Sequence, residues 1–356
     1  MPALIGITRP MEKKPGSIDQ MRMLLLINWP ESGEWYFLSR LKKETGHVAV
    51  LQPFRWKVFQ NKKLNRINIY LSEFYLPIIA FCMRKKFHAV VSWQMRLGIC
   101  YGILNALFPR AATPHIIQDF HIDPARRDWK YTLRLMLLAM AIRGIDFFLC
   151  TSTHEKDAYS KRFGIPSERI AFLPYSPPPG YVSLRSVPRG DYLFAYGNSD
   201  RDFDTLIRAV GHLDIRVIIL SRKFRPAAPL PRNVEHMYWS VPESQLIHYI
   251  AGARAVILPI THRFVAAGQV AMMETMALGR PLIVSANVAT VEYAIDGQTA
   301  LFFEPGDADM LSRHIRYLVE NPETAEEIGR RARQTMVGQP DLEVDVFIKL
   351  LQQTIA

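Results

Sequence analysis

Short apolar runs alternate with segments of helical periodicity along the whole chain, and this alternation limits the folds available to it. Five apolar runs of strand length fall in the first half, at residues 23–28, 47–51, 89–93, 115–118 and 147–151. Segments with helical spacing lie between them, at residues 34–45, 71–83, 97–107 and 129–142. Strands that alternate with helices predict a parallel sheet with crossover helices, which is the α/β class.

A proline-rich segment divides the alternation into two series. Residues 174–180 are Pro-Tyr-Ser-Pro-Pro-Pro-Gly, which suits neither a central strand nor a helix because proline fixes φ and lacks an amide hydrogen. The segment predicts a stiff linker. Strand-length runs then resume, at residues 192–196, 216–220, 255–259, 281–285 and 300–303. We therefore predict an α/β protein of two Rossmann-like domains, 1–178 and 179–340, with parallel sheets facing across a cleft and a helix in 341–356.

The excess positive charge of the chain lies in its first half. Residues 1–180 contain 26 lysines and arginines against 13 aspartates and glutamates, whereas the rest of the chain carries 18 against 20. The densest basic stretches are 55–66 and 84–86, and both are interleaved with aromatic and aliphatic residues. Two interpretations stay open, namely solvated helix faces or a surface that approaches anionic lipid. No motif typical of nucleic-acid binding occurs, so we expect no nucleic-acid partner.

The cysteines and the most apolar helical stretch indicate the cellular compartment in which the chain works. Cys82, Cys100 and Cys150 each lie in an apolar run without metal-ligand spacing, which predicts buried free thiols in a reducing compartment. We find no pattern of a secretory signal. The stretch 133–142 contains Arg134 and is too short to span a bilayer, so we interpret it as a core helix. We expect a cytoplasmic protein, with peripheral contact to the inner face of the membrane.

The segment around Gly268 and Glu274 has the residues of an anion-binding helix terminus. Gly268 stands between an apolar run and a helical pattern that begins near Gln269. Glycine lets the backbone approach a ligand closely, and the first-turn amides, including those of Gln269 and Val270, suit a diphosphate. Glu274, about one and a half turns further along, can accept two hydroxyl hydrogen bonds from a ribose. The alternative is a glycine that only breaks a loop and a glutamate on a helix surface.

Two longer stretches carry a family resemblance. Residues 274–283 are Glu-Thr-Met-Ala-Leu-Gly-Arg-Pro-Leu-Ile, and residues 291–307 are Val-Glu-Tyr-Ala-Ile-Asp-Gly-Gln-Thr-Ala-Leu-Phe-Phe-Glu-Pro-Gly-Asp. They resemble the carboxyl-terminal signature of the retaining GT-B glycosyltransferases of family 4, the glycosyl transferases of group 1. The resemblance is specific over residues 192–336 and weak before them. It implies the GT-B fold, a nucleoside diphosphate sugar as donor, transfer with retention, and a last helix that crosses back to the first domain.

The resemblance assigns donor-binding roles around this signature. Glu274 matches the family glutamate that binds the donor ribose. The family's other glutamate, which contacts the donor sugar, would fall at Ala266 and is missing. Glu292 matches a position near the donor, where we expect it to fix a loop.

The resemblance also places cations near the leaving diphosphate. The family uses an arginine and a lysine in the loop after the first strand of this domain, and the matching positions here are Asn198 and Arg201. One cation and the helix dipole can offset much of the diphosphate charge, and Arg222 and Lys223 follow the next strand closely enough to supply more. We therefore expect no metal ion and no other cofactor.

The first domain contributes candidates for the acceptor side. Asp119 and His121 follow a strand end two residues apart, so that in an extended segment both face the same way. Either could accept a hydroxyl proton or orient the nucleophile, and the alternative is a hydrogen-bonded turn. Glu31 and Gly33 resemble a reduced form of the family's glycine-rich acceptor loop, and residues 152–155, Ser-Thr-His-Glu, are similar to a family Ser-x-x-Glu.

These observations predict a hexosyltransferase. A nucleotide-sugar donor would pass its sugar to an acceptor hydroxyl, and the basic first domain favours a glycan or lipid-linked acceptor at an anionic membrane surface, in polysaccharide or glycoconjugate synthesis. Two other classes of function stay open. One is another enzyme on the same scaffold, such as a nucleotide-sugar epimerase or a glycogen-type phosphorylase. The other is a non-catalytic partner of another transferase that binds sugar nucleotides, which the missing glutamate at Ala266 motivates.

Overall fold

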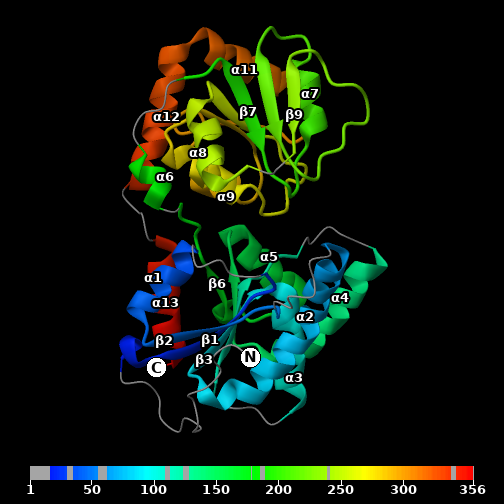
Figure 1. The fold of residues 1–356 in the computed structure, drawn as a ribbon, viewed down its shortest axis with the longest axis vertical. Coiled ribbons are helices and arrows are strands. Elements are labelled where there is room, and N and C mark those ends of the chain that lie inside the picture. The colour runs from blue at the N-terminus through cyan, green and yellow to red at the C-terminus, as the bar shows by residue number, and fades with distance from the viewer. Residues whose placement is uncertain are drawn as a thin grey trace. The chain divides into compact units, whose positions relative to one another are not determined.

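The chain forms two compact α/β units. The computed structural model describes residues 17–29, 35–54, 62–108, 113–122, 128–177, 179–184, 189–238, 241–337 and 342–355. One unit is Met1–Leu173 with Glu343–Ala356, and the other is Pro174–Leu342. Each unit holds a six-stranded parallel sheet with helices on both faces (Figure 1). The predicted class, two Rossmann-like halves with parallel sheets, is confirmed.

The sheet of the first unit has the strand order β2-β1-β3-β4-β5-β6. Its strands are β1 (Arg22–Leu26), β2 (His47–Leu51), β3 (Ala89–Gln94), β4 (His115–Asp119), β5 (Phe147–Cys150) and β6 (Ile170–Phe172). Leu24 of β1 pairs with Ala49 on one side and with Val90 on the other. Residues 23–26 are wholly buried, as expected for a parallel strand that is covered on both faces.

Helices cover both faces of this first sheet. They are α1 (Tyr36–Glu44), α2 (Lys62–Met83), α3 (Met95–Leu107), α4 (Trp129–Ala141), α5 (Thr153–Phe163) and α13 (Leu342–Ile355), with short 3-10 turns at Ile18–Gln20, Arg84–Lys86, Ile142–Gly144 and Ser167–Arg169. Leu24 and Leu26 face α2 and α3, whereas Met23 and Leu25 face α1 and α13. Phe347 of α13 meets Phe37 of α1 with ring centroids 5.4 Å apart. The last helix therefore packs within the first unit.

The sheet of the second unit has the order β12-β11-β10-β7-β8-β9. Its strands are β7 (Tyr192–Tyr196), β8 (Arg216–Leu220), β9 (Val234–Met237), β10 (Ala255–Leu258), β11 (Leu282–Ser285) and β12 (Leu301–Phe303). Its helices are α6 (Pro179–Ser183), α7 (Phe203–Val210), α8 (Glu243–Gly252), α9 (Gln269–Ala277), α10 (Thr290–Tyr293), α11 (Ala308–Glu320) and α12 (Pro322–Val337). α8, α9 and the second half of α12 build the core on one face, and α7, α11 and the first half of α12 build it on the other.

The structure corrects several local predictions. α2 begins at Lys62 rather than near residue 71, and α5 and β6 lie where no element was predicted. The proline-rich segment is not free of helix, because Pro179 begins α6 in the first turn, where a missing amide hydrogen costs nothing. Of the three cysteines only Cys150 is buried, whereas Cys100 is partly exposed and Cys82 is exposed.

The helix at residues 133–142 is the most consequential correction. These residues lie mostly in α4, and Leu133, Met136, Leu137 and Met140 are between 37 and 62% exposed. The interpretation as a core helix was wrong for this outer face, although Leu138 and Ala141 are buried. No helix in the part of the chain that the structure describes combines the length and apolar character needed to cross a membrane.

Candidate functional site

The second sheet has a topological switch point between β7 and β10, which are neighbours in the sheet although β8 and β9 lie between them in sequence. Ligands of open α/β sheets bind at the carboxyl ends of the strands at such a point. The loops that follow β7 and β10 are joined there by a β-bridge between Arg201 and Ile260. The Asp202 amide also donates to the Pro259 carbonyl at 3.0 Å. The two loops therefore form one connected surface.

Gly268 is the residue at which the β10 loop turns into α9. Its φ is +92°, and a Cβ atom there would lie 2.5 Å from Cδ1 of Ile260. The conformation favours glycine, and any other residue there would also have to displace the Cδ1 methyl of Ile260. The amides of Gln269 and Val270 belong to the first turn of α9, where backbone N–H groups have no partner within the helix and the dipole favours an anion.

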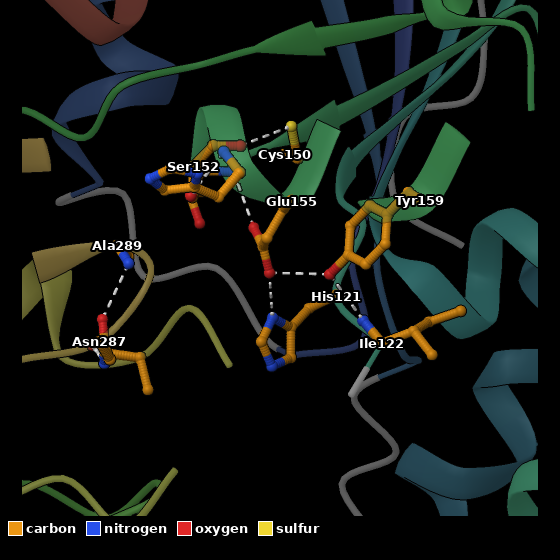
Figure 2. A network of polar contacts seen from close by, with 11 residues as sticks. His121, Ile122, Cys150, Ser152, Glu155, Tyr159, Asn287 and Ala289 are labelled. Carbon is orange, nitrogen blue, oxygen red and sulfur yellow. Dashed lines mark hydrogen bonds and ion pairs between the residues drawn. The ribbon is translucent and has the colours of Figure 1, made fainter. Parts of the chain in front are cut away.

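The loop before Gly268 is held from a second direction. Asn287, which follows β11, donates from Nδ2 to the Ala267 carbonyl at 3.0 Å. Its Oδ1 accepts from the amides of Ala289 at 2.9 Å and Thr290 at 2.8 Å, which starts α10 (Figure 2). Glu292 lies half-buried on α10, which packs against α9. Sequence reasoning missed Asn287, although an Asx residue directly before a short helical pattern is a recognisable helix start.

Glu274 lies on the inner side of α9 against Tyr196, the last residue of β7. The Tyr196 hydroxyl is 2.8 Å from Oε2 of Glu274 and 2.9 Å from the Ala271 carbonyl. Burial raises the pKa of Glu274 to about 7, although hydrogen bonds from Tyr196 and Tyr181 lower it. A tyrosine hydroxyl has one proton to donate. Oε2 of Glu274 and the Ala271 carbonyl share that proton, so the Tyr196 hydroxyl at the end of β7 is held against α9.

This environment predicts that Glu274 makes folding stability depend on pH. The folded pKa of about 7 exceeds the ordinary value of 4.5, so the folded chain binds this proton more tightly. The bound proton of Glu274 contributes fully to the free energy of unfolding below pH 4.5, and this contribution is lost as the pH rises through 7. Glu274→Gln removes this titration, so the melting temperature of the variant relative to the wild type should rise between pH 5 and pH 8. A difference that stays constant with pH would show that Glu274 does not titrate in this range.

Arg201 places a cation beside Glu274 and Tyr196. Its Nε donates to the Tyr196 carbonyl at 2.9 Å, and its Nη1 donates to the Ser199 carbonyl at 2.8 Å. Burial lowers the pKa of Arg201, and the nearby Tyr196, Asp200 and Glu274 oppose this shift. Arg201, Glu274 and Gly268 are thus brought together at the switch point.

Asn198 fixes the neighbouring loop after β8. Its Oδ1 accepts from the Arg222 amide at 2.8 Å, and Arg222 and Lys223 are exposed at that loop. Ala266, where the family pattern places its first glutamate, is buried. Asn198 therefore positions two further cations near the switch point instead of supplying one.

In the first unit, His121 belongs to a buried polar network (Figure 2). Its Nδ1 is 3.2 Å from Oε1 of Glu155, which also accepts from the Tyr159 hydroxyl at 2.7 Å. The Ile122 amide donates to the same hydroxyl at 3.1 Å. Glu155 is the third residue of α5, whose N-cap is Ser152, so the Ser-x-x-Glu pattern is a helix start with its glutamate turned to His121. Asp119 is half-buried at the end of β4, and burial raises its pKa.

A second polar cluster lies at the switch point of the first sheet, between β1 and β3. The Asn28 amide donates to Oε1 of Gln94 at 3.1 Å, and Nδ2 of Asn28 donates to Glu73 at 3.2 Å. Arg96 pairs with the same carboxylate at 3.1 Å. Sequence reasoning missed this cluster, although Glu73 is the only acidic residue of the 22-residue α2. Glu31 and Gly33, the predicted acceptor loop, lie outside the described residues.

Comparisons with known proteins agree with this geometry. Residues 227–335 match the family model of the glycosyl transferases group 1. A glycosyltransferase from Rickettsia africae has 14% identity and a TM-score of 0.68, with 95% of this chain and 99% of that chain covered. HepE of Anabaena in complex with UDP and glucose has 13% identity and a TM-score of 0.69, with 94 and 99% covered.

A third solved structure is similar over the same extent. Sucrose-phosphate synthase from Thermosynechococcus elongatus has 15% identity and a TM-score of 0.68, with 94 and 98% covered. None of the curated proteins compared with the chain matches it. At these identities the likeness to solved structures shows the shared fold, which spans both units.

Proposed function

We propose that this GT-B glycosyltransferase, whose residues 227–335 match the glycosyl transferases of group 1, moves a hexose from a nucleoside diphosphate sugar to an acceptor hydroxyl with retention. The observation that carries the proposal is the helix terminus at the switch point of the second sheet. There Gly268 opens α9, with Glu274 further along the same helix and Arg201 in the adjoining loop. An amide cradle, a cation and a carboxylate match a diphosphate and a ribose diol.

The donor would bind with each part against a chemically matched group. The diphosphate would lie at the amides of Gln269 and Val270 with Arg201 beside it, and the ribose hydroxyls would reach Glu274. When the bond between the sugar carbon and the diphosphate oxygen breaks, charge develops on that oxygen, and Arg201 and the α9 terminus would stabilise it. These groups supply the positive charge that a metal ion would otherwise contribute, so we propose that none is required.

Residues of the first unit would orient the acceptor hydroxyl and accept its proton. Glu155 would accept a hydrogen bond from Nδ1–H of a neutral His121, and Nε2 would then be the basic nitrogen of the ring. We propose that His121 or Asp119 accepts or orients the hydroxyl proton as the new sugar–oxygen bond forms. Glu155 would act as a positioning residue through His121.

The acceptor is proposed to be a lipid-linked glycan at the cytoplasmic face of a membrane, in polysaccharide or glycoconjugate synthesis. The support is the charge of the chain, since residues 1–180 carry twice as many basic as acidic residues. Anionic lipid attracts such a surface by about 1 kcal/mol per basic residue near it. An acceptor held in the membrane would then meet the enzyme in a favoured orientation.

A thermal-shift panel of UDP-, GDP- and ADP-sugars tests the donor assignment. A ligand that binds only the folded protein stabilises it by about 2.7 kcal/mol at a hundredfold excess over its Kd, so one base should stand out. The shift should persist with a chelator present and should shrink in Arg201→Met. If no nucleotide sugar raises the melting temperature, or if Arg201→Met responds like the wild type, the proposal is overturned.

Ala266 favours a second candidate, a non-catalytic partner that binds a nucleotide sugar without transferring it. A chain of this kind would pass the thermal-shift test and yet release no nucleoside diphosphate from the bound donor, with or without acceptor. Ala266→Glu restores the missing carboxylate. A gain of donor turnover in that variant, from a wild type without turnover, would support this candidate.

A further inference from the structure

One face of α2 presents large apolar side chains to solvent. They are Ile67, Tyr70, Leu71, Phe74 and Ile78, and each is more than half exposed. Their spacing of three and four residues places them on a single stripe. The opposite face of α2 packs against the sheet, where Leu76 and Ala80 are buried. Among the residues that the structure describes, this stripe belongs to none of the core clusters of the first unit.

A second stripe of the same kind lies on α4. Its members are Trp129, Leu133, Met136, Leu137 and Met140, and their exposure ranges from 37 to 71%. α3 packs against both α2 and α4, so the two helices that carry the stripes lie on one side of the first sheet with α3 between them (Figure 1). Leu107 and Phe108 at the end of α3 are also more than half exposed. Exposed apolar groups on this scale mark an interaction surface.

The charges on this surface indicate the kind of partner. Both stripes end in exposed basic residues, Lys85 after α2 and Arg143 after α4. α2 and α4 together contain a single acidic residue, Glu73, whose carboxylate is buried and paired with Arg96. A second copy of the chain would bring the same excess of basic residues and no exposed acidic residue of α2 or α4 to pair with it. An anionic lipid surface accepts both the apolar stripes and the cations.

We propose that the outer faces of α2 and α4 insert into the interfacial layer of an anionic membrane, as two amphipathic helices of a peripheral enzyme. This inference rests on the proposed lipid-linked acceptor and names the surface that reaches it. The 22 residues of α2 span about 33 Å, whereas the six residues of β3 span about 20 Å. Glu73 of α2 contacts Asn28, which lies past the carboxyl end of β1. The residues of α2 before Glu73, including Ile67 and Tyr70, therefore extend beyond the carboxyl ends of the strands, where the candidate acceptor residues lie.

Vesicle sedimentation with matched variants tests the inference. The protein is mixed with vesicles of phosphatidylcholine alone, or with about 30% phosphatidylglycerol as the anionic lipid. Phe74→Asp with Met136→Asp places one charge on each stripe, and Tyr317→Asp with Val337→Asp does the same at exposed apolar positions of α11 and α12. Lys85→Gln with Arg143→Gln removes the basic ends. An environment-sensitive dye on the exposed Cys82, which continues the α2 stripe, gives a second readout.

We expect the wild type to partition onto the anionic vesicles, with a blue shift of the dye. The stripe variant should lose about tenfold or more in partitioning, the α11–α12 variant should not change, and the Lys85–Arg143 variant should show a weaker preference for anionic lipid. Retained thermal shifts with the nucleotide sugar would show that all variants fold.

The inference is overturned if the wild type binds neither type of vesicle, or if the stripe variant binds the anionic vesicles as well as the wild type does. It is also overturned if the stripe variant instead dissolves a dimer seen by light scattering. Failure of the nucleotide panel with intact vesicle binding would count against the proposed function alone.

Discussion

Gly268→Ala is expected to abolish tight binding of the nucleoside diphosphate. The φ of +92° is unfavourable for alanine by about 1–2 kcal/mol, and the new Cβ would collide with Ile260 at 2.5 Å. Because Ile260 is wholly buried, its terminal methyl has little space to turn into, so part of the displacement falls on the loop that carries the first-turn amides. A displacement of the first-turn amides by about 1 Å can cost about a hundredfold, and we expect a loss of that order in affinity for the nucleotide. Titration calorimetry with UDP, GDP or ADP, whichever base the thermal-shift panel selects, measures the effect on binding.

Gly297→Ala is the matched control for this prediction. Gly297 also has a positive φ, of +70°, but a Cβ there would meet nothing within 4 Å. It therefore reproduces the backbone strain without the collision and lies in the turn before β12. The control should lose stability and keep its affinity for the nucleotide. Equal losses of affinity in both variants would show that strain alone weakens binding, and unchanged affinity in Gly268→Ala would place the nucleotide elsewhere.

The sheets could be predicted from sequence because parallel strands buried on both faces leave a strong local signal. The runs that became β1, β7 and β10 are continuous apolar segments bounded by polar or turn residues, and no tertiary information is needed to recognise them. α5 was missed because its 11 residues are largely polar and only Glu155 and Tyr159 are buried. The start of α2 was missed because five of its first seven residues, 62–68, are lysine, arginine or asparagine.

The candidate site was predictable only where its residues are close in sequence. Gly268, Gln269 and Glu274 belong to one helix start, so their relation could be inferred from spacing. The environment of Glu274 could not, because Tyr181 and Tyr196 come from segments far away in the chain. The environment of Glu73 could not be inferred either. Its partners Asn28 and Arg96 follow β1 and β3, which are neighbours in the sheet but far apart in sequence. Periodicity likewise finds an apolar helix such as α4 without showing which side faces the core.

Arg201→Met is expected to lower kcat for release of the nucleoside diphosphate by about a hundredfold to a thousandfold, as when a charge-stabilising donor is removed. Methionine keeps the length of the side chain and loses the cation, together with the bonds to the Tyr196 and Ser199 carbonyls. Arg201→Lys retains the charge and should recover much of the rate, while Arg313→Ala, at an exposed position of α11, controls for a general loss of positive charge. The rate is measured with the donor that the thermal-shift panel identifies, and the melting temperature of each variant is measured alongside it. If Arg201→Met lowers only the melting temperature and leaves kcat unchanged, Arg201 is a structural clamp on the β7 loop and the leaving diphosphate is stabilised by other groups.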